Sequence, residues 1–326
     1  MPLLLTETDV AALLETGALV DLMETTLADF SSGRTVQPVR TTLRLEEHES
    51  FIGVMPAALP GDAGAGLKVV TLAPRNAARG LPTHLATILV LDPETGALEA
   101  ILDGRLVTER RTAAVSAAAA RRLARAGAET LALLGSGVQA LSHLEAFAAV
   151  LPLREARVWS PNPERRAAFA RAHDGGRGFA VRAVASAEEA VRGADLVVAA
   201  TSARTPVLRG EWLAEGAHVS AVGACTPDWR ELDGEAVRRS RVYVDSLAAA
   251  RQEAGDLIGA EREGGWSFAE VVGELGALFA GGLAGRRDAR EVTLFKSLGL
   301  ACEDVASARW LIARARERGV GISIAI

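Results

Sequence analysis

The sequence predicts an α/β protein that combines a doubly wound parallel sheet with a second, discontinuous α+β domain. Three observations favour this fold class. A glycine turn at residues 135–137 joins an apolar run to a run with helical spacing. Strand patterns alternate with helical patterns over 130–245, which is typical of a parallel sheet with helical crossovers. Short strands separated by turns fill 36–102.

The N-terminal part of the chain predicts helices followed by an antiparallel sheet. Apolar residues recur at helical spacing over 3–30, which indicates one helix or two. Thr8 or Asp9 could cap the first helix and Gly17 could end it. The turn at 92–96 indicates a hairpin. We expect the strands of this sheet at 41–45, 50–57, 66–72, 85–91 and 98–103.

The remainder of the chain predicts the parallel sheet. An Ala-rich helix over 108–125 leads into it, and its small side chains suit a helix that joins two domains. The tail, 319–326, predicts a strand that returns to the N-terminal domain. Further helices are expected from 163, from 186, over 267–278 and over 300–318. Strands are expected at 130–134, 156–160, 179–184, 195–201, 218–223, 241–245 and 292–296.

Composition excludes several classes of function. A net charge of −5 argues against a nucleic-acid partner. No apolar run reaches the roughly 18 residues of a membrane span, and the start, MPLLLTETD, lacks the basic region of a signal peptide. The two cysteines, Cys225 and Cys302, have no metal-ligand spacing, so no metal is expected. Free cysteines suit a reducing cytoplasm.

Lysine is rare in this chain. Only two of the 36 basic residues are lysines, Lys68 and Lys296. Where arginine fills most cationic positions, a remaining lysine is a candidate for work that needs a compact ammonium with an adjustable pKa. Compositional drift is the alternative.

The glycine turn predicts a dinucleotide site. Gly135 permits a tight turn, Gly137 lets the backbone approach a phosphate, and Ala140 is the third small position, where helix packs on strand. The helix N-terminus then faces the anion. An ordinary glycine turn is the alternative.

The ends of the later strands should border the same cofactor. After the second strand, Ser160-Pro161-Asn162 offers no acid for a ribose 2′-OH, and Arg165 follows, which favours NADP(H) over NAD(H). Arg165 and Arg166 could instead form a solvated helix face. Thr201 and Ser202 end the fourth strand. Gly223 ends the fifth, and Cys225, nearby, is either a reactive thiol or a small packing residue.

The first domain offers Arg40, Lys68, Thr83, His84 and Arg111 as candidates for chemistry. His84 precedes an apolar strand and could equally be a core histidine. Arg110 and Arg111 lie near the amino end of the Ala-rich helix, where a cation is unfavourable, so at least one of them is expected to have an anionic partner. A substrate carboxylate and a protein acid are the two alternatives for that partner.

Together these residues resemble the ornithine cyclodeaminase/mu-crystallin family over nearly the whole chain. The matching runs are GLKVVT (66–71), LPTHLATILVLD (81–92), TERRTAAVSA (108–117), LLGSGVQALSHLEAF (133–147), VGACTPDWRELD (222–233), VYVDS (242–246) and LFKSLGLACEDVASA (294–308).

The resemblance implies a homodimer with two domains. Residues 1–112 and 297–326 would bind substrate and pair subunits, and a Rossmann domain over 113–296 would bind NAD(H) or NADP(H). Arg40 and Arg111 match a clamp for the substrate carboxylate. Lys68 matches the active-site lysine, with Thr83 or His84 orienting it or a water. The implied cofactor contacts are Thr112, Gly135, Gly137, Val138, Gln139, Ser160, Asn162, Arg165, Thr201, Ser202, Val222, Gly223, Cys225, Lys296 and Ser297.

One departure separates the chain from the cyclodeaminases proper. Cys225 stands where the resemblance places an Asp that handles the ornithine amines, and a thiol cannot replace that carboxylate. The sequence therefore favours a ketimine reductase, which transfers hydride between a nicotinamide and a C=N bond beside a carboxylate, in an imino or amino acid such as pyrroline- or piperideine-2-carboxylate. A true ornithine cyclodeaminase and a non-catalytic, crystallin-like NADP-binding protein are the alternatives.

Overall fold

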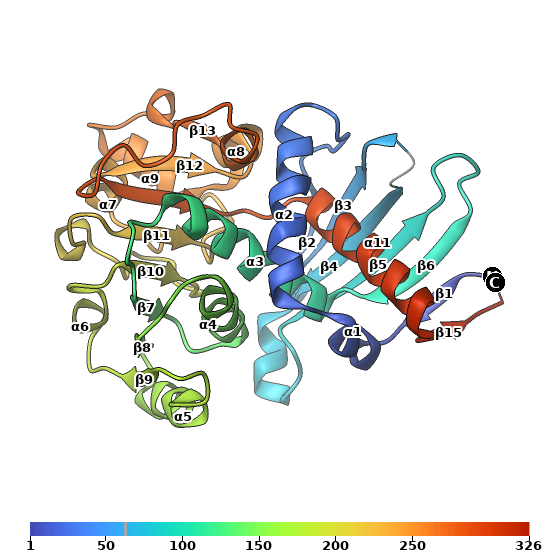
Figure 1. The fold of residues 1–326 in the computed structure, drawn as a ribbon, viewed down its shortest axis with the longest axis horizontal. Helices are drawn as coiled ribbons and strands as arrows, with labels where there is room; N and C mark the ends of the chain where they lie inside the picture. The colour runs from blue at the N-terminus through green and yellow to red at the C-terminus, as the bar shows by residue number, and fades with distance from the viewer. Residues whose placement is uncertain (62–63, 326) are drawn as a thin grey trace. The chain divides into compact units, whose positions relative to one another are not determined.

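The computed structural model describes residues 1–61 and 64–325, and the chain divides into two compact units (Figure 1). The first unit is Met1–Arg111 with Gly299–Ile326, and the second is Thr112–Leu298. We expected a division into 1–112 with 297–326 and 113–296. No helix in the described ranges is long and apolar enough to cross a membrane.

The first unit is built on a seven-stranded sheet in the order β15-β1-β6-β5-β4-β3-β2. Strands β2 to β6 pair with their chain neighbours in antiparallel fashion, as the short strands separated by turns predicted. The two ends of the chain join this sheet, because β1 pairs with both β6 and β15. The strands are β1 (Leu3–Leu5), β2 (Thr41–Leu45), β3 (Ser50–Ala58), β4 (Ala65–Leu72), β5 (His84–Leu91), β6 (Leu98–Asp103) and β15 (Ile322–Ser323).

The N-terminal segment begins with a strand rather than a helix, which corrects the expectation for 3–30. Thr6 caps α1 (Glu7–Leu13) in a capping box with Asp9, so the prediction of Thr8 or Asp9 as the cap was wrong. The chain is already extended at Leu14, before Gly17, and α2 (Thr16–Ser31) follows.

Helix α11 (Ala301–Arg318) covers one face of the sheet and packs on α2 (Figure 1). Its apolar side chains, among them Ala308, Leu311 and Ile312, share a core with Ile88 and Leu102 of the sheet.

The opposite face of the same sheet carries apolar side chains with little cover. Leu43, Ile52, Thr71 and Leu85 pair in successive registers, so they share one face. Leu43 is 59% exposed and Leu85 is 45% exposed, whereas Val54, on the same face, is 36% exposed.

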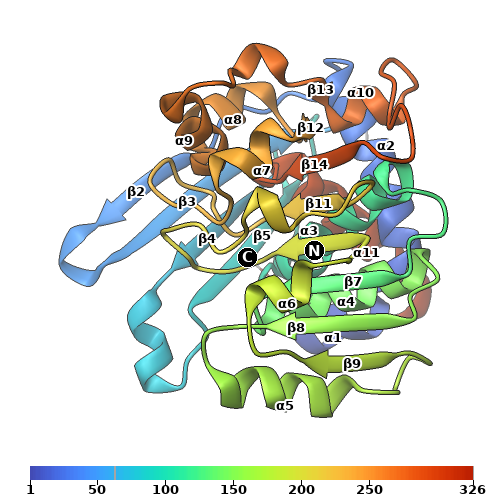
Figure 2. The ribbon, with the colours of Figure 1, turned by 90° about the vertical axis from the view of Figure 1, so that its left-hand side faces the viewer.

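The second unit is a fully parallel eight-stranded sheet in the order β13-β12-β14-β11-β10-β7-β8-β9. Figure 2 shows β7, β8 and β9 running side by side. The order reverses at β7, which creates a topological switch point. The strands are β7 (Thr130–Leu134), β8 (Glu155–Trp159), β9 (Ala180–Ala183), β10 (Leu196–Ala199), β11 (His218–Ala221), β12 (Ser240–Val244), β13 (Gly273–Glu274) and β14 (Val292–Lys296).

Helices connect these strands as expected, with two corrections. Helix α3 (Arg105–Leu123) begins before residue 108, because the Asp103 carboxylate accepts from the Leu106 N–H at its start. The helix expected over 267–278 is broken, because Gly273 has φ +153° and joins β13, so only α10 (Leu275–Phe279) is helical beyond it. The other helices are α4 (Val138–Val150), α5 (Pro163–His173), α6 (Ala187–Val191), α7 (Gly234–Arg238), α8 (Leu247–Glu253) and α9 (Gly255–Glu263).

Candidate active site

Two cations predicted from the sequence meet at one carboxylate in the first unit. Lys68, in β4, places its Nζ 2.6 Å from Asp304 of α11. Arg111, in α3, donates from Nε to the other Asp304 oxygen at 2.9 Å and from Nη1 to Glu303 at 2.5 Å. All four residues are buried, and Lys68 is 1% exposed. The cluster is therefore a compensated group of charges held under α11.

The surroundings of Lys68 lower its pKa from 10.5 to about 8. Burial is the largest cause, and the positive charges of Arg111 and Arg40 act in the same direction. Asp304 opposes them. Arg40, half-buried just before β2, is thus within electrostatic reach of Lys68. An ammonium with this pKa can release a proton near neutral pH.

His84 opens β5 beside the same cluster. Burial, followed by the charges of Lys68 and Arg111, lowers the pKa of His84 to about 4. The imidazole is therefore neutral at physiological pH and can exchange hydrogen bonds without carrying charge. Thr83, the residue before it, is half-buried.

The sequence reasoning missed Glu303 and Asp304 as site residues. The run ACEDVASA was used only for the family resemblance, yet it contains two adjacent acids in an otherwise apolar stretch. Both side chains are 0% exposed. Since Arg110 or Arg111 was expected to have an anionic partner, this buried acid pair was the signal that could have identified it.

The second unit gathers the candidate cofactor residues along one edge of its sheet. Strands β14, β11, β10, β7 and β8 are neighbours and parallel, so their carboxyl ends lie at the same edge. The candidates at these ends are Gly135, Gly137, Val138 and Gln139 after β7, Ser160, Asn162 and Arg165 after β8, Thr201 and Ser202 after β10, Val222, Gly223 and Cys225 after β11, and Lys296 with Ser297 at the end of β14. Thr112 lies in α3 and is largely buried.

The glycine turn has the geometry that a pyrophosphate requires. Gly135 has φ +122°, and a Cβ there would lie 2.4 Å from the Ala200 oxygen, so only glycine fits. A Cβ on Gly137 would meet nothing within 4 Å, which leaves the start of α4 open to a ligand. Val138, in the first turn of α4, is 55% exposed. These residues fit a dinucleotide, which would bring its phosphates against the helix N-terminus.

The turn after β8 is tied to the glycine turn. The Ser160 and Ser136 hydroxyls lie 2.8 Å apart. Asn162 caps α5 by accepting from the Arg165 N–H, and Arg166 donates to the Ser160 carbonyl. Arg165 is exposed. The turn itself, 160–162, contains no carboxylate, and Glu164 and Arg165 follow it in the first turn of α5.

A third buried acid, Glu231, holds the ends of β10 and β11. Its carboxylate accepts from the N–H and hydroxyl of Thr201 and from the N–H groups of Gly223 and Ala224. Glu231 is 0% exposed, and the sequence reasoning did not single it out.

Lys296 is fully buried and pairs with Asp256 of α9 at 2.9 Å. Burial alone would lower the pKa of Lys296, but Asp256 and Glu231 raise it overall. The Lys296 ammonium is therefore charged, and it is buried against Asp256 at the carboxyl end of β14. Ser297, the next residue, is also buried and donates its N–H to Ala221 at 3.0 Å.

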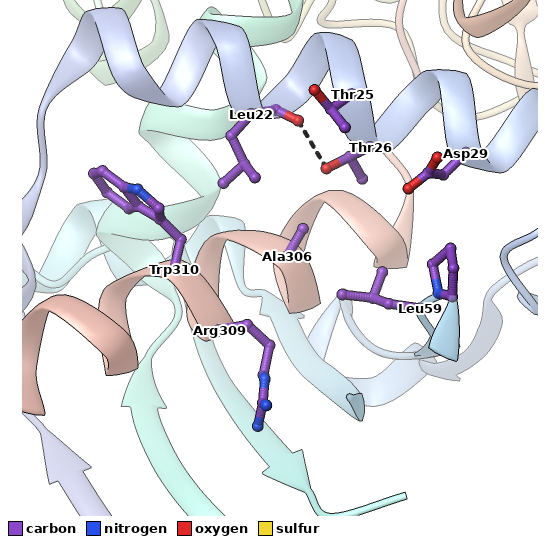
Figure 3. A pocket seen from close by; sticks show the side chains of 9 residues that line it. Leu22, Thr25, Thr26, Asp29, Leu59, Ala306, Arg309 and Trp310 are labelled. Atoms are coloured by element: carbon purple, nitrogen blue, oxygen red, sulfur yellow. Dashed lines mark hydrogen bonds between the residues drawn. The ribbon is translucent and has the colours of Figure 1, made fainter. Parts of the chain in front are cut away.

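A separate hollow of about 370 Å³ lies between α2 and α11 (Figure 3). Thr26 and Leu22 line its α2 side, and the Thr26 hydroxyl donates to the Leu22 carbonyl at 2.8 Å, as the dashed line shows. Arg309 and Trp310 line the α11 side. None of the four cluster residues borders it, so this hollow is not the candidate active site.

A family model for the ornithine cyclodeaminase/mu-crystallin family matches residues 1–319. The chain belongs to this family. Ketimine reductase mu-crystallin of Mus musculus is 41% identical over 294 residues, which are 89% of this chain and 90% of the relative. A Delta(1)-pyrroline-2-carboxylate reductase of Bacillus cereus is 38% identical over 296 residues, which are 90% of this chain and 91% of the relative.

The solved structure of the Thermococcus litoralis Delta(1)-pyrroline-2-carboxylate reductase, in complex with NADH and L-proline, has a TM-score of 0.96 to this chain. Its sequence is 38% identical, and the match covers 99% of this chain and 100% of that one. The family resemblance and the α/β fold class predicted from the sequence are confirmed. The chain is an NAD(P)-dependent oxidoreductase of the ornithine cyclodeaminase/mu-crystallin family that acts on carbon–nitrogen bonds.

Proposed function

We propose that this family member reduces a cyclic ketimine that carries a carboxylate, such as pyrroline- or piperideine-2-carboxylate. One observation carries the proposal: Lys68 and Arg111 converge on Asp304 in a buried cluster, with Arg40 within electrostatic reach. A guanidinium offers paired donors to a carboxylate, and a buried lysine offers an acid of suitable strength. The names of the two reductases compared above support the same substrate class.

In this proposal, Arg40 and Arg111 bind the substrate carboxylate. Glu303 and Asp304 hold the Arg111 guanidinium through Nη1 and Nε, which fixes its plane before substrate arrives. Lys68 supplies the proton that the imine nitrogen gains. A bound reduced nicotinamide would supply the hydride for the imine carbon. Neutral His84, with Thr83, orients the Lys68 ammonium or a water beside it.

We propose NADPH rather than NADH as the preferred cofactor. Residues 160–162, directly after β8, include no acid that would bind the ribose 2′-OH, and exposed Arg165 follows in the first turn of α5, where it would bind a 2′-phosphate. The contacts proposed at the glycine turn and at Thr201, Ser202, Val222 and Gly223 serve either cofactor.

The test is a substrate panel with NADPH and NADH, following loss of the reduced nicotinamide. Cyclic imino acids should oxidise the cofactor, and 2-oxo acids with amines should be poorer substrates. Lys68→Ala should abolish turnover while cofactor affinity stays within a few-fold of wild type. Absence of oxidation with every imino acid would contradict the proposal and favour a non-catalytic binding protein.

Ornithine cyclodeamination is the second candidate, and the half-buried thiol of Cys225 argues against it. A thiol cannot balance a substrate ammonium as a carboxylate would. Ammonia release from ornithine, with no net change in cofactor, would reverse this preference.

We further propose that the protein is a cytoplasmic homodimer. The open apolar sheet face around Val54 supports pairing of subunits through the first unit. Cys225 and Cys302 are free thiols, which supports a reducing compartment.

A further inference from the structure

Glu231 joins two loops that border the proposed cofactor site. Its Oε1 accepts from the Thr201 N–H at 2.5 Å and from the Thr201 hydroxyl at 2.8 Å. Its Oε2 accepts from the N–H groups of Gly223 at 2.6 Å and Ala224 at 3.2 Å. One carboxylate thus fixes the residues that follow β10 and those that follow β11. Three of these four donors are backbone N–H groups, which can only donate, so both carboxylate oxygens must accept.

The packing of these two loops leaves no room for a side chain at residue 223. A Cβ at residue 223 would lie 2.0 Å from the Thr201 oxygen and 2.6 Å from Glu231 Oε1. Glycine at 223 is therefore what allows the two loops to close on the same carboxylate.

A second buried carboxylate and Lys296 hold Glu231 itself. The Asp256 Oδ1 accepts from the N–H groups of Glu231 at 2.7 Å and Leu232 at 2.9 Å. The other Asp256 oxygen pairs with Lys296 Nζ at 2.9 Å, at the end of β14. Glu231, Asp256 and Lys296 are each 0% exposed. The ends of three adjacent strands are thereby linked through side chains that do not reach the surface.

We propose that Glu231 is a positioning residue that sets the nicotinamide half of the cofactor site. This inference rests on the proposed cofactor site at the carboxyl edge of the sheet. The glycine turn after β7 holds the pyrophosphate, so the loops after β10 and β11, on the side away from β8, border the nicotinamide half. Glu231 acts through Thr201 and Gly223 and has no contact with the cofactor.

The experiment compares two ligands that share one half. Whichever of NADPH and NADH the wild type binds more tightly is titrated calorimetrically. The second ligand is the matching ADP-ribose, which carries the 2′-phosphate only if NADPH is used and which lacks the nicotinamide ring. Glu231→Gln replaces an acceptor oxygen with a donor and leaves at least one loop unanchored. It should weaken binding of the reduced cofactor by about tenfold, the usual cost of losing a charge-assisted hydrogen bond. Binding of the ADP-ribose should change by less than about twofold.

Asp195→Asn is the matched control. Asp195 is also buried and accepts from the N–H groups of Glu129 and Thr130 at 2.9 and 3.0 Å, but at the amino ends of the strands. Its substitution should leave the ratio of the two affinities unchanged.

Glu231→Asp keeps the charge and withdraws it by one methylene, which serves if the glutamine variant fails to fold. An unchanged affinity ratio in a folded Glu231 variant, or equal losses for both ligands, would overturn the inference. Failure of wild type to bind the reduced cofactor at all would instead overturn the proposed cofactor site.

Discussion

At the scale of single residues, burial gives Lys68 a property that an exposed lysine lacks. Removal from water opposes its charge, while Asp304 preserves it, and the balance brings the pKa to about 8. His84, under the same influences, has a pKa of about 4 and stays neutral. One group of the pair therefore titrates close to physiological pH.

This difference predicts the pH dependence of turnover. If the Lys68 ammonium donates the proton, kcat/KM should fall about tenfold per pH unit above pH 8, as the acid form is lost. An ordinary histidine titrates with a pKa of about 6.5. Because His84 is already neutral there, kcat/KM should not change between about pH 5.5 and pH 7.5 through its titration. Steady-state rates over pH 5.5 to 10, with cofactor binding measured in parallel, check this. Constant kcat/KM up to pH 10 would exclude Lys68 as the donor.

Asp304 should be essential for stability as well as activity. Asp304→Asn leaves the buried charges of Lys68 and Arg111 without their shared counterion, which should cost about 3–5 kcal/mol of unfolding free energy. Chemical denaturation measures this loss. Glu317→Gln, on the exposed side of the same helix, is the control and should unfold near the wild-type midpoint. Equal midpoints for the two variants would refute the shared-counterion role.

The sequence identified both lysines but not what surrounds them. Their rarity among basic residues marked Lys68 and Lys296, and each is buried against an aspartate. The partner of Lys68 is Asp304, far along the chain, and no local pattern connects the two. The adjacent acids Glu303 and Asp304 stand out in their apolar run, but which cations they pair with depends on tertiary packing, so composition and spacing could not predict the pairs.

At the scale of elements, the two glycines of the turn after β7 have different functions. Gly135 is required by the chain itself, through its φ of +122° and the nearby Ala200 oxygen. Gly137 faces open space, so the fold does not demand it. The space beside Gly137 is therefore open to a ligand.

The two alanine variants should separate stability from binding. Gly135→Ala should lower the melting temperature, because the new Cβ collides with backbone in a conformation that alanine disfavours. Gly137→Ala should melt near wild type yet bind the reduced cofactor at least about tenfold more weakly, a loss of about 1.4 kcal/mol. Thermal denaturation and calorimetric titration of both variants test this. Undiminished binding in Gly137→Ala would remove the phosphate from this turn.

Elements with a clear period were predicted well, whereas those fixed by distant pairing were not. The parallel strands β7, β8 and β14 were located within a residue or so of their observed bounds. The strand β1 was read as helix, because Leu3–Leu5 is apolar and its strand character comes from pairing with β6. The break near Gly273 was missed because β13 exists only through its pairing with β12.

At the scale of the whole molecule, the open face of the first sheet bears on assembly. Apolar side chains from β2, β3 and β5 lie on it with little cover, including Leu43, Val54 and Leu85. Such a face is favourable to bury against a second copy, whose identical strands present the same surface.

Val54→Glu should convert the proposed dimer to monomers, because it places a charge on that apolar face. Sedimentation velocity at micromolar concentration measures the change. Leu247→Glu alters a leucine of similar exposure, 37%, in the second unit and should leave the mass unchanged. A wild-type protein that sediments as a monomer, or a Val54→Glu dimer, would refute this interface.

The pairing of β1 with β15 has a consequence for how the chain matures on the ribosome. Strand β1 lies in a sheet whose last strand, β15, is synthesised more than 300 residues later. Helix α11 brings Glu303 and Asp304, so a nascent chain that has reached Leu298 has Lys68 and Arg111 but lacks the acids that neutralise them. The cluster of Lys68, Arg111, Glu303 and Asp304 can therefore form only after α11 has been synthesised.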